Sequence, residues 1–294
     1  MGRALAVLIW LLTLGSVWLF LSGKWWFPPS ITEHGPAVDR QFLITIIVVG
    51  IAFTAAQVGL GYMVWRYRET AGGERALYSH GNNRLEIIWT IITAAIFIGL
   101  AVMGQRVWAA LHLNNAPPGS NRVEVVAQQF QWNFHYAGKD GQFGRTDAKF
   151  INDDNLNFVG LDGTDPKAKD DVVTTTLVIP VGRPTEFILR SKDVTHSLWI
   201  PQTRFKQDLV PGMTIPAYFK PVKAGRFELA CAELCGMNHF KMKAYVLVLP
   251  EAEYGPLMTL GQDQFLTRVS ELAQKYELNA LYDENGNKLQ QGSY

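Results

Sequence analysis

The two cysteines of the chain stand in one short stretch that also holds other soft metal ligands. This stretch, CAELCGMNHFKM, begins at Cys231 and contains Cys235, His239 and Met242. Thiolate, imidazole and thioether groups together favour copper and suit Mg²⁺ or Ca²⁺ poorly. Cys231 and Cys235 are four positions apart, as are Cys235 and His239, so one loop between two strands can direct several ligands to one point. The stretch therefore predicts a copper-binding loop.

A second histidine, His196 in DVTHSLWIP, could approach the same point from a neighbouring loop. One histidine plus a Cys–His–Met loop is close to the blue-copper ligand set, but Cys231 and Cys235 give one thiolate more than a single copper of that kind uses. Two coppers bridged by both sulfurs would use every ligand, so we predict a dinuclear copper site. A disulfide between the two cysteines and a four-ligand Cys₂His₂ zinc site are the alternatives.

The composition predicts a membrane protein with a polar C-terminal part. Charged residues make up only 18 % of the chain, against about 25 % in an average soluble domain. The difference comes from three apolar runs, at residues 4–22, 41–65 and 87–105. A helix needs about 20 apolar residues to cross a bilayer. We predict that the last two runs span the membrane, and that the first is a third spanning helix rather than a signal peptide.

Basic residues between the apolar runs predict the orientation of the chain. Four arginines lie between residues 66 and 84, whereas only two basic residues lie between the first and second runs. Positively charged loops stay in the cytoplasm. The chain after Arg106 is therefore predicted to lie on the outer side. The net charge of +1 gives no sign of a nucleic-acid partner.

The polar part of the chain predicts an all-β domain. From about Asn121, short segments rich in β-branched and aromatic residues alternate with Gly and Pro turns, which is typical of a sandwich or barrel. An acidic insertion at residues 139–171 is predicted to be a solvated surface loop. The predicted boundaries are an extra N-terminal helix and linker at 1–40, a transmembrane helical hairpin at 41–110, the β domain at 121–250, and a helical tail at 251–294.

Together these motifs resemble subunit II of haem–copper cytochrome c oxidase. The resemblance rests on the pattern H-S-x-x-x-P-x-x-x-x-K-x-D…P-G…G-x-x-x-x-x-C-x-E-x-C-G-x-x-H-x-x-M, which runs from His196 to Met242. The segments NNRLEIIWT, before the third apolar run, and QQFQWNFHY also resemble the family. The resemblance implies N-terminal transmembrane helices followed by a cupredoxin-type Greek-key β-barrel that carries the dinuclear copper centre CuA.

The resemblance also implies roles for individual residues. The implied CuA ligands are the bridging thiolates of Cys231 and Cys235, the imidazoles of His196 and His239, the thioether of Met242 and the backbone carbonyl of Glu233. The side chain of Glu233 is implied to bind Mg²⁺ at the contact with subunit I, with Asp208 near that contact. Trp132 is implied to receive the electron from the donor, and His239 to pass it on. We expect a hydrophobic shell around the ligands, for which Trp199, Leu234, Met237 and Phe240 are available.

The implied function is that of the electron-accepting subunit of a respiratory cytochrome c oxidase. Electrons from a c-type cytochrome or another haem-bearing donor protein would pass to the haem of subunit I, where O₂ is reduced to water and protons are pumped. The implied partners are subunit I, other oxidase subunits and the lipid bilayer of a bacterial inner membrane, with the copper domain on the periplasmic side. No C-x-x-C-H motif for a fused c-type haem occurs in the sequence. The alternative function is a membrane-anchored copper-delivery protein.

Overall fold

The computed structural model describes residues 1–23, 27–70, 73, 78–152 and 154–289. The chain divides into two compact units. The first consists of Met1–Phe27 and Ala37–Ala109, and the second of Pro28–Pro36 and Ala110–Tyr294. Part of the arginine-rich loop, residues 71–72 and 74–77, lies outside the described residues.

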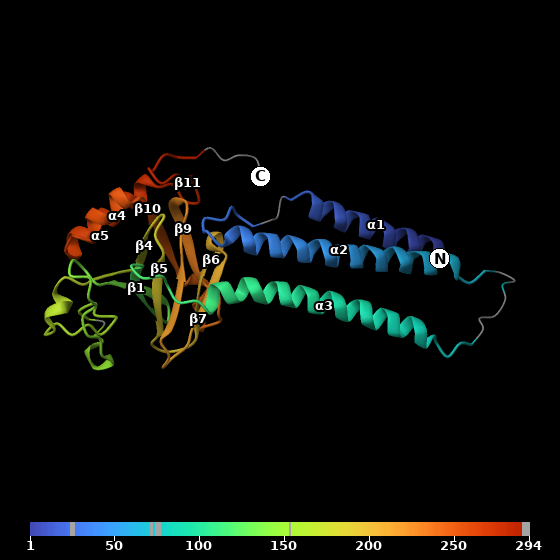
Figure 1. Cartoon of the computed structure of the whole chain (residues 1–294), viewed down its shortest axis with the longest axis horizontal. Coiled ribbons are helices and arrows are strands. Elements are labelled where there is room, and N and C mark those ends of the chain that lie inside the picture. Colours follow the sequence, from blue (N-terminus) through green and yellow to red (C-terminus); the bar gives the residue numbers. More distant parts are fainter. Residues whose placement is uncertain (24–26, 71–72, 74–77, 153, 290–294) are drawn as a thin grey trace. The chain divides into compact units, whose positions relative to one another are not determined.

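Three long apolar helices make up the first unit (Figure 1): α1 at Gly2–Leu21, α2 at Gly35–Arg66 and α3 at Asn83–His112. All three are long and apolar enough to cross a membrane, which confirms the predicted N-terminal helices. The side-chain oxygen of Asn82 accepts the backbone N–H of Leu85 (3.2 Å), and Glu86 lies in the first turn of α3. Both features stabilise a helix N-terminus.

Within the first unit, α1 packs against α2 through a tryptophan and a glycine. The indole N–H of Trp10 donates to the carbonyl of Val58 (3.3 Å), and the ring stacks on Trp65. A Cβ at Gly61 would lie 2.2 Å from the Trp10 nitrogen, so only glycine leaves room for the ring. The first apolar run therefore forms a helix that is fitted to the second.

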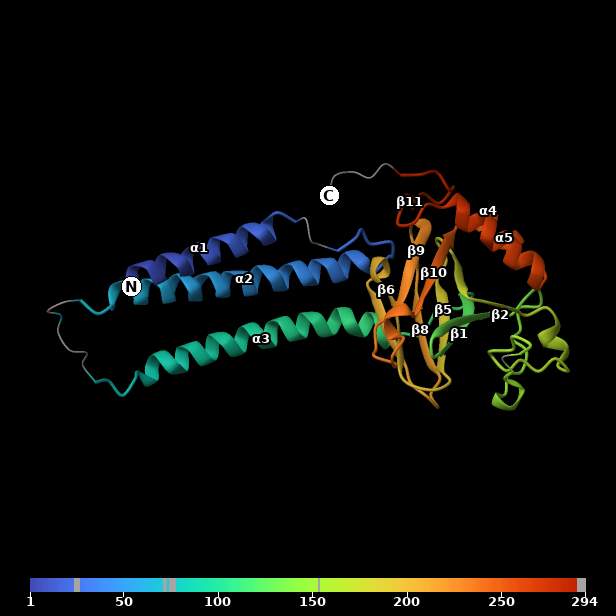
Figure 2. The same cartoon turned by 180° about the vertical axis from the view of Figure 1, so that it is seen from behind.

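Two packed sheets form the second unit (Figures 1 and 2). The first sheet has the order β3-β2-β1-β5-β8, with β1 at Asn121–Gln128, β2 at Gln131–Tyr136, β3 at Val172–Thr174, β5 at Thr185–Ser191 and β8 at Ile215–Phe219. The second has the order β4-β10-β9-β6-β7, with β4 at Thr176–Pro180, β6 at His196–Ile200, β7 at Phe205–Leu209, β9 at Ala224–Cys231 and β10 at Lys243–Leu249. The pairs β1–β5 and β4–β10 are parallel, and the others are antiparallel. The structure confirms the predicted β domain after the helices.

The core lies between the two sheets and ends at the predicted metal ligands. Successive side chains of a strand point to opposite faces, and in β9 the buried residues Phe227, Leu229 and Cys231 alternate with less buried ones. The same alternation that builds the core therefore turns the sulfur of Cys231 inward at the end of β9.

Pro28–Pro36, between α1 and the body of α2, belongs to the β unit. Ile31 is fully buried in the core. Its N–H donates to the carbonyl of Gln202 (2.9 Å), and its carbonyl accepts the N–H of Val222 (2.7 Å). The part of the predicted linker around Ile31 is thus hydrogen-bonded to the β domain and packed into its core.

Residues 139–171 contain two short 3₁₀ helices, η1 at Ala148–Phe150 and η2 at Pro166–Lys169, whose N-termini are capped by Asp147 and Asp165. Asp140 and Asp154 are exposed, as predicted for a solvated loop, and Asp147, Asp165 and Asp170 are partly exposed. The prediction is wrong for Asp162 and Asp171, which are 1 % and 8 % exposed. Asp162 is buried because it pairs with Arg145, a partner that composition alone does not reveal.

Beneath the insertion lies a buried cluster of charged groups around His135. The two ring nitrogens of His135 each lie 2.7 Å from a carboxylate, one of Glu124 and one of Asp171. The other oxygen of Glu124 pairs with Arg190 (2.8 Å). Asp171 also accepts the N–H of Gly144 (2.7 Å). The insertion is therefore held to the sheet by hydrogen bonds to charged groups.

The C-terminal residues form α4 at Glu251–Leu257, α5 at Gln262–Lys275 and β11 at Leu281–Tyr282. The helix α5 buries Phe265, Val269 and Leu272, and Phe265 packs near the ring of Tyr136 on β2 (5.6 Å between centroids). The strand β11 pairs with β9.

The charged cluster predicts a pH-dependent stability. Burial alone would lower the pKa of His135, but hydrogen bonds to Asp171 and Glu124 outweigh it and raise the pKa above the ordinary value of about 6.5. The contribution of the imidazolium to stability is therefore complete below about pH 6.5 and is lost as the pH rises through the raised pKa. The difference in Tm between the wild type and His135→Gln should narrow as the pH rises above about 6.5, in thermal unfolding of the detergent-solubilised chain.

The matched control is His80→Gln, at an exposed histidine, for which no such narrowing is expected. A difference between wild type and His135→Gln that stays constant from acid to alkaline pH would contradict the role given to the imidazolium.

Candidate metal centre

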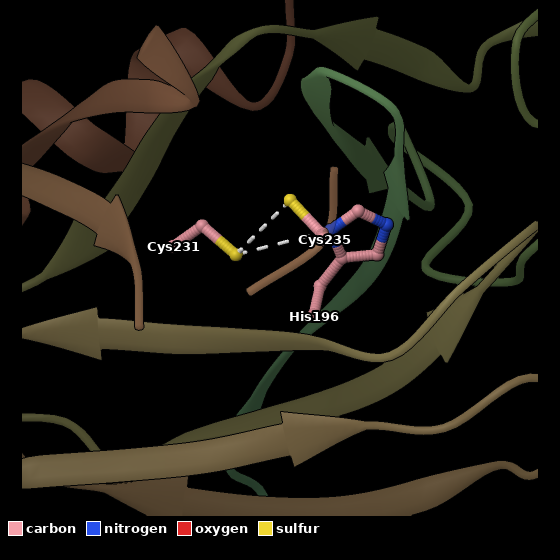
Figure 3. Close-up of side chains that lie close together, drawn as sticks. All are labelled: His196, Cys231 and Cys235. Atoms are coloured by element: carbon pink, nitrogen blue, oxygen red, sulfur yellow. Dashed lines mark hydrogen bonds between the residues drawn. The ribbon is translucent and has the colours of Figure 1, made fainter. Parts of the chain in front are cut away.

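Three chain segments bring the predicted ligands together at one end of the β domain. His196 is the first residue of β6, and Cys231 is the last residue of β9. These strands are neighbours, with Leu198 opposite Cys231 in the ladder. The loop after β9 carries Cys235 and then a 3₁₀ turn, η4, at His239–Lys241. Figure 3 shows the side chains of His196, Cys231 and Cys235 pointing toward one another.

The ligand atoms form two similar halves around the two sulfurs. The Sγ of Cys231 lies 3.8 Å from Nδ1 of His196 and 3.2 Å from the carbonyl oxygen of Glu233. The Sγ of Cys235 lies 3.6 Å from Nδ1 of His239 and 3.7 Å from Sδ of Met242. Each thiol thus has one imidazole and one weak ligand of its own.

The two cysteines are free thiols, and their Sγ atoms are 3.9 Å apart. A disulfide bond is about 2.05 Å long, so Cys231 and Cys235 do not form the alternative disulfide in this structure. Both cysteines and His196 are buried, and their ligand atoms lie within 4.8 Å of one another.

The donor set fits soft metal ions such as copper. The set consists of two sulfurs, two imidazole nitrogens, a thioether and a carbonyl. The last two are weak ligands of the kind found at electron-transfer copper sites. A single tetrahedral zinc would use only the thiols and the imidazoles, and would leave Met242 and the carbonyl of Glu233 without a role.

The electrostatics of the metal-free pair favour one thiolate and one thiol. Burial alone would raise the pKa of Cys231, but the contact with His196 outweighs it and lowers the pKa to about 6. Burial and the negative charge on Cys231 raise the pKa of Cys235 to about 11. A bound cation must therefore displace the proton from the second sulfur, as metal binding to thiols does generally.

Asp193 orients the imidazole of His196, a role that the motif did not reveal. Its Oδ1 lies 2.8 Å from Nε2 of His196, so Nδ1 is the nitrogen that faces the sulfur. The carboxylate also accepts the N–H groups of Val194 and Gln129, each at 2.7 Å. Burial alone would raise the pKa of Asp193, but the hydrogen bonds from Gln129 and His196 outweigh this effect, so the pKa lies below its ordinary value. The only signal in the sequence is an acid three positions before a ligand histidine.

Trp132 lies beside the centre but away from solvent. Its ring meets that of His196 edge-on, with centroids 6.3 Å apart, and the residue is only 1 % exposed. Among the described residues, its buried indole N–H has no hydrogen-bond partner.

The expected hydrophobic shell is made of other residues than those suggested. Trp199, Leu234, Met237 and Phe240 are 40 %, 79 %, 94 % and 68 % exposed. Trp199 is on the exposed face of β6. Leu234, Met237 and Phe240 are exposed residues of the ligand loop. Buried apolar side chains do lie near the site: Leu198 is opposite Cys231 in the ladder, Leu229 precedes Cys231 by two positions on β9, and the ring of Trp132 lies beside that of His196.

The two acids expected near subunit I lie close to the ligands. Glu233 is half-buried and sits between the two cysteines in the loop. Asp208 on β7 lies opposite Ser197, the neighbour of His196, and its carboxylate pairs with Lys206 (2.8 Å).

Comparison with known proteins identifies the family. The family described as "Cytochrome C oxidase subunit II, periplasmic domain" matches residues 122–248, and "Cytochrome C oxidase subunit II, transmembrane domain" matches residues 31–107. The alternative cytochrome c oxidase subunit 2 of Bradyrhizobium diazoefficiens is 36 % identical over 253 residues, which cover 85 % of this chain and 89 % of that protein. The chain belongs to the cytochrome c oxidase subunit II family.

Two more distant similarities accompany this match. The cytochrome c oxidase subunit 2 of Thermostichus vulcanus is 29 % identical over 271 residues, 82 % of this chain and 81 % of that one. The crystal structure of the periplasmic domain of cytochrome oxidase subunit II from Bradyrhizobium japonicum is 24 % identical, with a TM-score of 0.37, and covers 51 % of this chain and 99 % of that chain.

Family membership makes the chain a membrane-anchored subunit II of an oxidoreductase, with a periplasmic-type domain of cupredoxin fold. The transmembrane match begins at residue 31, so α2 and α3 correspond to the family's helices. The helix α1 lies outside that match.

Removal of the Asp193 carboxylate should weaken metal binding. Without it, the imidazole of His196 loses the acceptor that fixes its orientation, and such outer partners are generally worth about 10- to 100-fold in metal affinity. We expect Asp193→Ala to lose copper to a competing chelator about 10- to 100-fold more readily than the wild type.

The control for this measurement is Asp263→Ala, at an exposed acid on α5, which should match the wild type. Equal copper retention in Asp193→Ala and the wild type would show that the carboxylate does not position the ligand.

Proposed function

We propose that this subunit II accepts electrons from a c-type cytochrome or another haem-bearing donor protein at a dinuclear copper centre, CuA. The electrons then pass to the haem of subunit I, where O₂ is reduced to water and protons are pumped. The observation that carries the proposal is the paired geometry: two thiols 3.9 Å apart, each with its own imidazole and its own weak ligand.

In this proposal the copper centre would be held by the thiolates of Cys231 and Cys235. The remaining ligands would be His196, His239, Met242 and the carbonyl of Glu233. When bound, the copper pair supplies a one-electron redox centre whose charge change is shared between two metals. The protein holds the ligands on two paired strands and a short 3₁₀ turn, so little has to move when the charge changes.

The proposed electron path within this chain starts at Trp132 and leaves by His239. Contact between the rings of Trp132 and His196 (6.3 Å) supports the first step. Because Trp132 is only 1 % exposed, the donor would pass its electron through the residues that cover this ring rather than to an exposed ring. His239 is partly exposed on η4, which supports a contact with a neighbouring subunit.

We also propose that the Glu233 carboxylate binds Mg²⁺ together with groups of subunit I, with Asp208 nearby. Carboxylate oxygens are the ligands that Mg²⁺ prefers. The backbone carbonyl of Glu233 faces Cys231 (3.2 Å), so one residue would serve the copper pair with its main chain and the Mg²⁺ with its side chain.

The proposed location is a bacterial inner membrane, with the β domain on the periplasmic side and other oxidase subunits beside the helices. The excess of arginine between α2 and α3 supports this orientation. The proposed organisation is an additional N-terminal helix, a transmembrane hairpin, a copper domain and a C-terminal tail. Copper delivery is less favoured, because Cys231 and Cys235 are 8 % and 2 % exposed and delivery requires ligands that a second protein can reach.

Cys235→Ser should abolish the paired copper site and donor-driven oxidase activity. A hydroxyl is a hard, poor ligand for copper, and the change in volume is small enough for the fold to persist. Electron paramagnetic resonance of the copper-loaded protein should lose the signal of an electron shared by two coppers, while circular dichroism stays that of the wild type. Undiminished oxidase turnover in this variant would rule out the assignment.

Trp132→Phe should slow electron transfer from the donor severalfold while copper content stays normal. The smaller ring keeps the core filled but increases the gap to His196. Stopped-flow oxidation of the reduced donor measures this step, with Trp199→Phe, at an exposed tryptophan on β6, as the control. If donor oxidation is as fast in Trp132→Phe as in the control, the electron does not pass through Trp132.

A further inference from the structure

The turn between β1 and β2 is hydrogen-bonded both to the loop before β6 and to the ligand loop after β9. Gln129 is the first residue of this turn. Its backbone N–H donates to Oδ2 of Asp193 (2.7 Å), and its side-chain amide donates to the carbonyl oxygen of Cys235 (2.6 Å). One residue thus bonds to the loop before β6 and to the loop after β9.

Both hydrogen bonds of Gln129 lead to predicted metal ligands. The first reaches His196 through Asp193, and the second ends on Cys235 itself. The other oxygen of Asp193 lies 2.8 Å from Nε2 of His196, and Cys235 supplies a sulfur. A continuous chain of hydrogen bonds therefore runs from His196 through Asp193 and Gln129 to Cys235. The partners of Gln129 are 64 and 106 residues away in the sequence, so only the folded domain brings them together.

The packing around Gly236 gives a second, independent sign that this turn is fitted to the ligand loop. Gly236 has a φ of +126°, which L side chains rarely adopt. A Cβ there would lie 2.8 Å from the amide nitrogen of Gln129 and 3.2 Å from Cζ of Phe130. A larger residue at 236 would displace the amide from the carbonyl of Cys235.

We propose that Gln129 is a positioning residue that holds the His196 and Cys235 sides of the copper centre in register. The inference rests on the proposed copper function. Gln129 itself is exposed and lies in a turn, so its side chain contributes little to the core. Loss of its amide should therefore appear in the geometry of the ligands rather than in the stability of the fold.

The test compares Gln129→Met with Gln131→Met in the full-length, copper-loaded chain. Methionine keeps the length of glutamine but cannot donate a hydrogen bond. Gln131 is the matched control because its amide donates within its own strand, to Asn133 (2.7 Å). We expect Gln129→Met to lose copper to a chelator on the order of 10-fold faster, with an altered copper hyperfine pattern and a shifted reduction potential, and Gln131→Met to match the wild type.

A second variant, Gln129→Glu, guards against a folding defect in the first. It places a carboxylate oxygen against the carbonyl of Cys235, so repulsion replaces attraction and the effect on copper loss should be at least as large. Wild-type spectra, potential and copper retention in both Gln129 variants would overturn the proposal.

A measurement on the metal-free protein separates this proposal from the proposed function. Cys235 is 2 % exposed, so its alkylation by iodoacetamide reports opening of the ligand loop. We expect alkylation of Cys235 to be severalfold faster in Gln129→Met than in Gln131→Met. If alkylation is faster in Gln129→Met but the wild type shows no paired copper signal, the copper function is refuted and the positioning role of Gln129 is retained. If alkylation is equal in the two variants, only the positioning role of Gln129 is refuted.

Discussion

The antiparallel pairing of β6 with β9 is the contact on which the metal centre depends. It places His196 at the start of one strand beside Cys231 at the end of the other. Because side chains alternate along a strand, a slip of one residue would turn Cys231 to the opposite face of the sheet. The buried side chains of Phe227 and Leu229 prevent this slip, so the hydrophobic core fixes the register that the ligands need.

The ligand loop adds the remaining donors within a few residues of that fixed point. Since Cys235 and His239 are close to Cys231 in sequence, local turns suffice to bring them back to the first sulfur. This explains why Cys231, Cys235, His239 and Met242 could be proposed as a ligand group from their spacing, whereas the carbonyl of Glu233 was implied only by the family resemblance. The three long apolar helices could also be predicted from the sequence, because the length of a spanning helix is set by the bilayer rather than by the rest of the fold.

What the sequence did not reveal are the contacts made between distant segments. Asp193 and Gln129 carry no motif, and their roles depend on three loops meeting at one end of the sandwich. The role proposed for Trp132 was implied by family resemblance, and the burial of its side chain depends on what covers the strand. The acidic insertion looked like a solvated loop because composition cannot show that Asp171 pairs with His135 (2.7 Å) on the sheet beneath it.

The short strand β11 has a consequence for the exposed edge of the second sheet of the β domain. β6 pairs with the C-terminal half of β9, whereas Leu281 and Tyr282 pair with Gly225 and Ala224 at its N-terminal half. Without that cover, this part of β9 would present unpaired backbone groups, which are templates for edge-to-edge aggregation. The pairing of β11 with β9 therefore covers a sheet edge that would otherwise favour self-association of the domain.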